Sequence, residues 1–397
     1  MNRPFPLLDG YRAIAALMVL TTHVAFNTGE ILVPGIGPLL GRMDFGVTLF
    51  FLLSGFLLYR PWARAAMTAK SGPAIGSYAL RRGARILPAY WLMVVFTLLV
   101  LPDIQPVRWQ AWPVHLGMLH IYLPGFSLEG LTQTWSLATE ISFYVALPLI
   151  AWLTGRRHRG DPDASARWQL TILAIGIALA WLYTSVRVSG IVGSADLAAY
   201  WLPGFIDWFA LGMAAAVIQV RLRMPAPPGW MRSIRSVAGA TAWCLLIAAS
   251  LYVIASTPLA GPLTFSPAEP SSLVVKHILY AIIAAFLLLP GFLGVGDTDP
   301  TEPPSRSAWA RLLAHPVVVY LGTISYGIFL WHLVLLRLLQ GGLNLPVFGG
   351  GFWFLWPLVI LSSVLVASLS WFAVERPLQR WSHRPRRTAA ATSVAKR

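Results

Sequence analysis

Long apolar runs of about 20 residues recur along the whole chain, and they constrain its fold more than any other feature. A run of this length is what an α-helix needs to cross the hydrocarbon core of a bilayer. Of the 397 residues, 57% are hydrophobic and only 11% are charged, whereas a soluble domain carries about 25% charged residues. The sequence therefore predicts an all-α, multi-pass membrane protein.

Ten such runs predict ten transmembrane helices. The second and third runs are short, so we expect them to include flanking residues. The predicted spans are Leu7–Phe26, Gly46–Tyr59, Pro88–Leu101, Trp135–Thr154, Trp168–Val186, Trp201–Val220, Val237–Ser256, Leu273–Phe292, Val317–Leu339 and Phe352–Val374.

The distribution of basic residues predicts the orientation of these spans. The chain holds 30 Lys and Arg residues against 15 Asp and Glu residues. Alternate loops collect the basic residues, whereas the intervening loops hold only Arg42, Arg108 and Arg187. This asymmetry follows the positive-inside rule and places both termini in the cytoplasm. It also accounts for the positive charge through contacts with membrane lipids, so we expect no nucleic-acid partner.

The chain reads as one membrane domain, residues 1–381, followed by a basic tail, residues 382–397, that we expect to be disordered. No internal repeat is apparent, which disfavours an inverted-repeat transporter. No metal-ligand cluster and no phosphate-binding glycine loop are visible, so we expect no metal and no permanently bound cofactor. Only three of the basic residues are Lys, a bias associated with bacterial genomes. We therefore predict a bacterial cytoplasmic (inner) membrane protein, whose oligomeric state the sequence does not indicate.

Ionisable residues inside predicted spans are costly and are therefore candidates for function. Five of them stand out, namely Arg12, His23, Glu140, Asp207 and His332. Asp207 is expected to pair with an arginine. His332 is either a polar contact between helices or part of a site.

Arg12 and His23 share the first span and are eleven residues apart, close to three helical turns, so both face one side of the helix. A guanidinium suits phosphate recognition, and a neutral imidazole suits proton abstraction from a hydroxyl. Their separation along the axis is about 16 Å, which would let one long ligand touch both. The alternative is that Arg12 reaches the membrane surface and His23 only contacts a neighbouring helix.

Two further polar pairs lie near span ends. Arg82 and Arg85 share a helix face at the predicted inner surface, where they could bind a nucleotide phosphate or lipid head groups. Ser136 and Glu140 are four residues apart at the start of the fourth span, where they could serve a site or stabilise helix packing. The segment Glu375-Arg376-Pro377 reads as the end of the last helix with a surface anchor.

Five segments, in order along the chain from Leu7 to Pro377, resemble the motifs of the membrane acyltransferase-3 family. The family's Arg-x10-His, Arg-x-x-Arg and late Ser-Tyr-x-x-Tyr-x-x-His patterns are among them. The segments are Leu8 to His23, Gly46–Leu57, Arg82–Trp91, Trp135–Tyr144 and Ser325–His332. Two departures are Tyr11, where the family often has Leu, and Thr48, where an acidic residue is frequent. The hydrolase-like domain that some members append is not expected here.

The resemblance implies a ten-helix membrane domain that takes an acyl donor, usually acetyl-CoA, from the cytoplasm as a co-substrate. The acceptor would be a sugar or lipid hydroxyl of the cell envelope. His23 would be catalytic, as a general base or a transient acyl carrier, with Glu140 as a second catalytic residue. The remaining implied site residues are Arg12, Arg82 and Arg85 on the donor side, and Trp135, Ser136, Tyr144 and His332 beside the substrate.

Two other functions remain open from the sequence. The chain could move a lipid-linked sugar or an acylated lipid across the membrane, or it could be a non-catalytic partner in envelope assembly. Consumption of a thioester distinguishes the enzyme from both. Four charged or basic residues of an intact site, Arg12, His23, Arg82 and Arg85, argue against a decayed enzyme.

Overall fold

The computed structural model describes residues 6–189, 196–262, 268–294 and 307–382. These residues form helices joined by loops, and no strand occurs among them. Residues 383–397 of the predicted basic tail lie outside the described residues. The longer helices are α1 (Pro6–Thr28), α3 (Gly46–Met67), α4 (Ile75–Val100), α6 (Trp135–Gly155), α7 (Pro162–Val188), α8 (Ile206–Leu222), α9 (Gly229–Gly239), α10 (Thr241–Ala255), α11 (Pro270–Leu293), α13 (Pro316–Gly342) and α14 (Phe352–Ser370).

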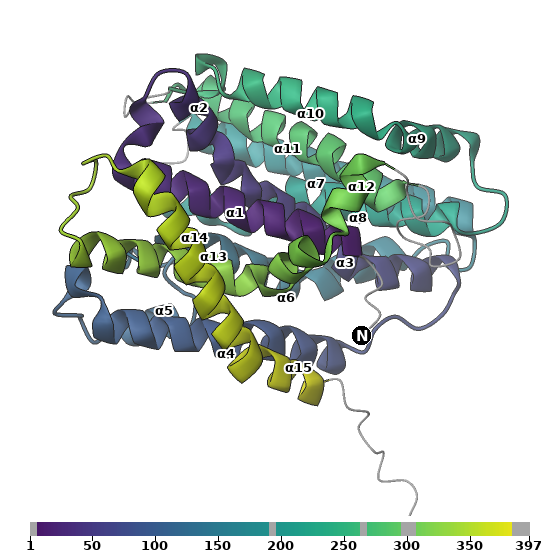
Figure 1. The fold of residues 1–397 in the computed structure, drawn as a ribbon. Helices are drawn as coiled ribbons and strands as arrows, with labels where there is room; N and C mark the ends of the chain where they lie inside the picture. Colours follow the sequence, from purple (N-terminus) through teal and green to yellow (C-terminus); the bar gives the residue numbers. More distant parts are fainter. Residues whose placement is uncertain (1–5, 190–195, 263–267, 295–306, 383–397) are drawn as a thin grey trace, which may run out of the picture.

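The long helices run side by side as one bundle (Figure 1). Helix α1 packs against α13, α3 and α14, and α3 also packs against α8, so α1 and α3 lie inside the bundle. Shorter helices occupy the connections, namely α2 (Ile36–Gly41), α5 (Ala111–Leu116) and α12 (Ala308–Leu313). The all-α prediction is therefore confirmed for the part of the chain that the structure describes.

Seven helices in the described residues are long and apolar enough to cross a membrane, and an eighth results if α9 and α10 form one bent span. These two helices meet at an angle of 77°. The other two expected spans correspond to α1, which carries Asp9, Arg12 and His23, and to α8, which has only 17 residues. The multi-pass architecture stands, whereas the count of ten and the orientation of the termini remain predictions.

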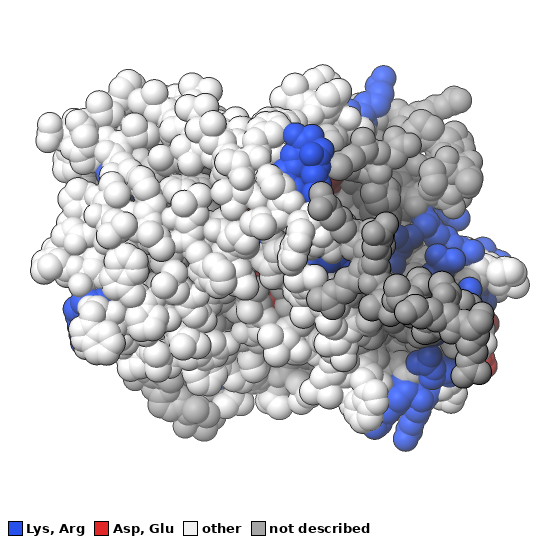
Figure 2. Space-filling model, turned by 90° about the horizontal axis from the view of Figure 1, so that it is seen from below, with Lys and Arg blue, Asp and Glu red and all other residues white. Residues whose placement is uncertain are grey.

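Lys and Arg side chains gather toward one end of the bundle, and most of the surface between the ends is uncharged (Figure 2). We call this the basic end. It is where α3 ends and α4 begins, with Arg60 and Arg64 on one helix and Arg81, Arg82 and Arg85 on the other. Such a charge distribution is typical of a membrane protein whose basic end lies at the cytoplasmic surface.

Glycines allow the central helices to approach closely. A Cβ atom at Gly322 of α13 would lie 1.9 Å from the carbonyl oxygen of Asp9 on α1. A Cβ at Gly55 of α3 would lie 2.1 Å from the carbonyl oxygen of Phe209 on α8, and one at Gly212 would lie 2.0 Å from that of Leu52. Small residues at helix contacts are how membrane helices pack without a hydrophobic driving force between them. These contacts fix α13 against α1 and α8 against α3.

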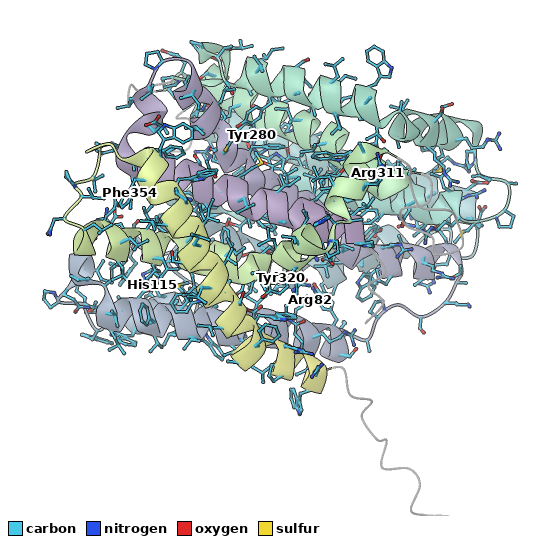
Figure 3. The ribbon with its side chains drawn as sticks, in the orientation of Figure 1. Arg82, His115, Tyr280, Arg311, Tyr320 and Phe354 are labelled. Atoms are coloured by element: carbon cyan, nitrogen blue, oxygen red, sulfur yellow. The ribbon has the colours of Figure 1, made fainter. Side chains whose placement is uncertain are left out.

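The segment between α4 and α6 covers the end of the bundle opposite the basic end. Asp103 in this segment forms an ion pair with Arg337 of α13 at 2.7 Å. The imidazoles of His115 and His120 stack with ring centroids 5.0 Å apart. Figure 3 shows His115 far along the bundle from Arg82 at the beginning of α4. The segment thus closes the bundle on the side that the sequence assigns to the outside.

Candidate functional site

Two histidines from distant parts of the chain meet inside the bundle. His23 of α1 and His332 of α13 have ring centroids 5.0 Å apart, with their planes at 43°. The Nε2 atom of His332 lies 3.1 Å from the Nδ1 atom of His23. His332 is fully buried, whereas His23 is partly exposed. The two candidates that the sequence placed on separate helices therefore form one pair.

The carbonyl groups around this pair determine which nitrogens carry protons. Nδ1 of His332 lies 2.8 Å from the carbonyl oxygen of Phe329 and 3.2 Å from that of Ile328. Because a carbonyl only accepts, Nδ1 of a neutral His332 carries the proton and its Nε2 is an acceptor. Nδ1 of His23 must then donate, to His332 and to the carbonyl oxygen of Val19 at 2.8 Å.

This arrangement leaves Nε2 of His23 with a lone pair. Among the described residues no hydrogen bond reaches that nitrogen. A general base or a nucleophile needs an unprotonated, partly exposed nitrogen on a ring that is held in place. Here the hydrogen bond at Nδ1 holds the imidazole ring of His23, and Nε2 is that nitrogen. The pair therefore presents one reactive atom, Nε2 of His23.

A group of arginines lies on the basic side of the histidine pair. Arg12 of α1 forms an ion pair with Asp9 at 3.1 Å and interacts electrostatically with Arg85 and Tyr144. Arg82 interacts in the same way with Arg85, Tyr144 and other polar groups of the cluster. The structure thus brings together Arg12, Arg82 and Arg85, which the sequence analysis named as one group.

Arg82 and Arg85 are both half-buried, and neither forms an ion pair or hydrogen bond with another described residue. Like charges that lie close together repel one another, and an anion bound between them relieves this repulsion. A guanidinium presents its donors in a fork that matches phosphate or carboxylate oxygens. The cluster is therefore suited to binding a polyanion.

Glu140 belongs to the arginine cluster and not to the histidine pair. Its Oε1 atom accepts a hydrogen bond from the hydroxyl of Tyr144 at 2.7 Å and another from the hydroxyl of Ser54 on α3. The carboxylate also interacts electrostatically with Arg82. No hydrogen bond joins it to a histidine among the described residues. Glu140 therefore joins α3 to α6 beside the arginines.

The other residues predicted beside the substrate lie near the start of α6. The buried hydroxyl of Ser136 donates to the carbonyl oxygen of Gln133 at 3.2 Å, so it does not contact Glu140 through a hydrogen bond. Trp135 is half-buried and packs against Phe51 and Phe205. These two residues form the wall of the bundle next to Glu140 and Tyr144.

Thr48 and Asp44 lie on the other side of His23. Position 48 is where the family frequently has an acidic residue. The side chain of Thr48 is fully buried and its hydroxyl has no hydrogen-bond partner in the described chain. The nearby Asp44 interacts electrostatically with His23. Its carboxylate forms an ion pair with Lys276 at 2.7 Å and accepts a hydrogen bond from Tyr280. An acidic group is thus present near His23 although position 48 lacks one.

Two sequence expectations about acidic residues need correction. Asp207 does not pair with an arginine: its Oδ2 atom accepts from Nε2 of His277 at 2.9 Å and from the indole of Trp181 at 3.0 Å. Glu375 is not at a helix end. It is 2% exposed in the interior of a continuous helix and interacts electrostatically with Arg85. The sequence Glu-Arg-Pro around Glu375 does not indicate that the residue is buried inside a helix.

No group of three or more potential metal ligands occurs among residues 6–189, 196–262, 268–294 and 307–382. The stacked pair of His115 and His120 has no third ligand there.

Comparisons with known proteins give a consistent result. The family described as acyltransferase domain, Acyl_transf_3, matches residues 5–372. The chain is 26% identical to "Putative peptidoglycan O-acetyltransferase YrhL" of Bacillus subtilis, over 95% of this chain and 55% of that protein. It is 22% identical to "Putative O-acetyltransferase SACOL0978" of Staphylococcus aureus, over 95% and 58% of the two chains.

A third relative is "Nodulation protein 10" of Rhizobium leguminosarum, which is 22% identical over 94% of this chain and 92% of its own length. The chain spans little more than half of the Bacillus and Staphylococcus relatives, but nearly all of the Rhizobium protein. No solved structure matches the chain.

Proposed function

Because the chain belongs to the acyltransferase-3 family, we propose that it is an O-acyltransferase that moves an acetyl group from acetyl-CoA to a hydroxyl of an envelope glycan or glycolipid. The family assignment rests on a match over residues 5–372. The similarity to the Bacillus subtilis relative named for peptidoglycan O-acetylation supports a glycan acceptor. The bacterial inner membrane is the proposed location.

The arginine cluster is the proposed binding site for the phosphate groups of acetyl-CoA. Arg82 and Arg85 have no protein carboxylate bound to them, and Arg12 is the next cation toward His23. Since Arg12 lies eleven residues before His23 on α1, the two are about 16 Å apart along the helix axis. A pantetheine arm is an extended chain that suits this separation. The donor would enter from the cytoplasm if the basic end faces it.

The proposed chemistry uses Nε2 of His23 as the base. This nitrogen removes the proton of the acceptor hydroxyl while the hydroxyl oxygen attacks the thioester carbonyl carbon. The carbon–sulfur bond then breaks, and the CoA thiolate takes the proton back from the imidazolium. The imidazole ends as it began, and the products are the O-acetyl ester and CoA with a free thiol.

His332 is proposed to orient the base. As an acceptor for Nδ1–H of His23, it fixes the tautomer whose lone pair is at Nε2 and stabilises the positive charge of the transient imidazolium. The single observation that supports this mechanism most strongly is the 3.1 Å contact between the two imidazoles. A transporter has no need of a base with a fixed tautomer.

The experiment is thioester consumption by the full chain purified in lipid nanodiscs. Acetyl-CoA with a labelled acetyl group is supplied with an envelope glycan fraction, and both free CoA and labelled ester are measured. The proposal predicts equal amounts of the two products, formed only when acceptor is present. If the protein itself became labelled without acceptor, transfer would proceed through an acyl-histidine intermediate and not directly. If neither free CoA nor labelled ester formed, the proposed function would be contradicted.

A further inference from the structure

Helix α9 differs in direction from the long helices around it. It has 11 residues, Gly229–Gly239, and follows the end of α8 at the basic end of the bundle (Figure 1). It meets α10 at an angle of 77°, with only Ala240 between the two helices. Helix α10 packs along α11, which is one of the seven helices long and apolar enough to span the membrane. Because α10 follows a spanning helix, α9 is the one that turns toward the plane of the membrane.

The side chains of α9 are divided between an apolar face and a polar face. Trp230, Ile234 and Val237 are at positions i, i+4 and i+7, so they share one face of the helix. Arg232 and Ser236, at positions i and i+4, lie on the other side. A helix with arginine on its polar face and tryptophan on its apolar face is typical of segments that lie in the interface of a membrane.

The apolar face of α9 is only partly used for packing within the protein. Met231 and Ala238 are buried, and α9 packs against α11 and α8. In contrast, Trp230 and Val237 are 47% and 49% exposed. Trp243 near the beginning of α10 is 65% exposed and continues this apolar surface onto the spanning helix. Tryptophan side chains are enriched where membrane proteins meet the head-group region, so lipid is the expected cover for this surface.

The length of α10 supports the same position for α9. Helix α10 has 15 residues, which corresponds to about 22 Å at 1.5 Å per residue. The hydrocarbon core is about 30 Å thick, so α10 alone leaves about 8 Å uncovered. An interfacial helix lies about 5–10 Å deep, at the boundary between head groups and acyl chains. If α9 lies there, α10 begins below the membrane surface, and the missing length is accounted for.

The polar face of α9 carries positive charge without acidic residues nearby in the sequence. The stretch from Arg221 to Ala240 holds several arginines and no Asp or Glu. Arg232 is exposed and forms no ion pair with another residue that the structure describes. A guanidinium matches the geometry of phosphate oxygens, and basic residues near a membrane surface are attracted to anionic phospholipids. The charge of this face is therefore complementary to an anionic leaflet.

We propose that α9 is an interfacial helix that binds the phospholipid leaflet at the basic end, with Trp230 and Val237 among the acyl chains and Arg232 on anionic head groups. The predicted span Val237–Ser256 is then formed by α10 alone, and residues 229–239 do not cross the membrane. The lipid contact sets the depth at which the basic end lies. This inference does not depend on the proposed acyl transfer.

The first test measures the depth of α9 in the full chain. Cys244 is the only cysteine, and Cys244→Ser keeps a donor for the carbonyl of Val237, to which the thiol donates at 3.3 Å. In this background Trp230→Cys, Val237→Cys and Ser236→Cys are each spin-labelled and placed in nanodiscs of phosphatidylglycerol and phosphatidylcholine. Electron paramagnetic resonance then compares collisions with oxygen, which concentrates in the membrane, and with a nickel chelate, which stays in water.

Labels at positions 230 and 237 should collide mainly with oxygen, whereas the label at position 236 should collide mainly with the nickel chelate. Since residues 236 and 237 are neighbours and both are exposed, each is the matched control of the other. Collision of all three labels mainly with the chelate would place α9 in water. Shielding of all three from the chelate would place it inside the membrane, and either result would overturn the proposal.

The second test measures the contact with anionic head groups. A fluorophore on Val237→Cys is quenched by spin-labelled phosphatidylglycerol or by spin-labelled phosphatidylcholine, and the ratio reports which lipid lies beside α9. Phosphatidylglycerol should be preferred, and Arg232→Gln should reduce the preference about fivefold, as expected for one basic residue at an anionic surface. Arg232→Lys should keep it, and Arg108→Gln, at the opposite end of the bundle, should leave it unchanged. Equal quenching by the two lipids with Arg232 intact, or an unchanged preference in Arg232→Gln, would overturn the head-group contact.

Discussion

Nε2 of His332 lies within 3.1 Å of Nδ1 of His23, and the two residues are 309 positions apart in the chain. Their contact depends on the packing of α13 against α1, which in turn depends on Gly322. The carbonyls of Phe329 and Val19 fix the direction of the hydrogen bond between the rings. This relationship and the arginine cluster beside it lead to four predictions, and a fifth concerns the segment between α4 and α6.

Replacing His332 should impair catalysis without abolishing donor binding. His332→Leu removes the acceptor for Nδ1–H of His23 and should lower kcat on the order of 100-fold, because the base loses its tautomer and orientation. His332→Gln offers a side-chain carbonyl as acceptor and should restore part of the rate. The pH–rate profile should shift in His332→Leu, and His158→Gln, an exposed histidine, is the control. A normal pH profile and rate in His332→Leu would remove the orienting role.

Neutralising the donor-site arginines should raise the KM for acetyl-CoA. Arg82→Gln or Arg85→Gln each removes charge-assisted hydrogen bonds worth about 1.5–3 kcal/mol, which corresponds to about a 10- to 100-fold rise in KM. Arg64→Gln, an exposed arginine at the same basic end, should behave like the wild type. Equal effects of all three substitutions on KM would mean that the cluster contributes only general surface charge.

Widening the contact between α1 and α13 should damage both stability and activity. In Gly322→Ala the new Cβ would lie 1.9 Å from the carbonyl oxygen of Asp9, so the helices must separate. Overpacking of this kind costs about 1–3 kcal/mol. Gly341→Ala, on the same helix, has no atom within 4 Å of its Cβ and should keep the wild-type Tm and rate. Similar melting curves for the two variants would contradict the packing argument.

The segment between α4 and α6 should loosen as the pH falls. Burial lowers the pKa of His115 to about 4, and burial together with the neighbouring His115 lowers the pKa of His120 to about 4. The unfolded segment binds protons below the ordinary histidine pKa of about 6.5, whereas the folded segment binds them only near 4. Stability is therefore complete above about pH 6.5 and is lost between about 6.5 and 4.

Hydrogen exchange of residues 102–134 measures this effect. Between pH 7 and pH 5, amide protection in this segment should fall after correction for the intrinsic chemical exchange rate. The double replacement His115→Leu with His120→Leu should abolish this loss of protection. Equal protection at pH 7 and pH 5 in the wild type would show that the two imidazoles do not limit the stability of the segment.

The sequence identified candidate site residues, but it did not show which residues of other helices they contact. The eleven-residue spacing of Arg12 and His23 places both on one face of α1, and the structure places each in a polar cluster, one with arginines and one with His332. A periodic pattern reports the face of a single helix. It carries no information about which distant helix packs there, so the pairing of His332 with His23 could not be predicted.

The partners of the acidic residues could not be read from the sequence for the same reason. The hydrogen bonds of Glu140 to Ser54 and Tyr144 depend on how α3 and α6 pack. Asp207 finds His277, 70 residues later, through the contact between α8 and α11. Glu375 lies two residues before Pro377, and a proline usually marks a helix end. A π turn has no signature that single-sequence patterns reveal.

The span count differs for a physical reason as well. Apolar composition predicts crossing helices well when a run is long and carries few charges, as in α11 and α13. It performs poorly for α1, whose polar residues face the site, and for α8, which is short. The bend of 77° between α9 and α10 cannot be read from hydropathy, because the predicted span Val237–Ser256 begins in the last residues of α9 and continues through α10.

Nε2 of His23 is the reactive atom of the proposed mechanism. The decisive measurement is acetyl transfer by His23→Ala in nanodiscs, with CoA binding determined on the same preparation. The predicted result is a loss of transfer on the order of 1,000-fold or more, with CoA bound as in the wild type. Transfer at the wild-type rate by a folded His23→Ala protein would contradict the catalytic role of this imidazole.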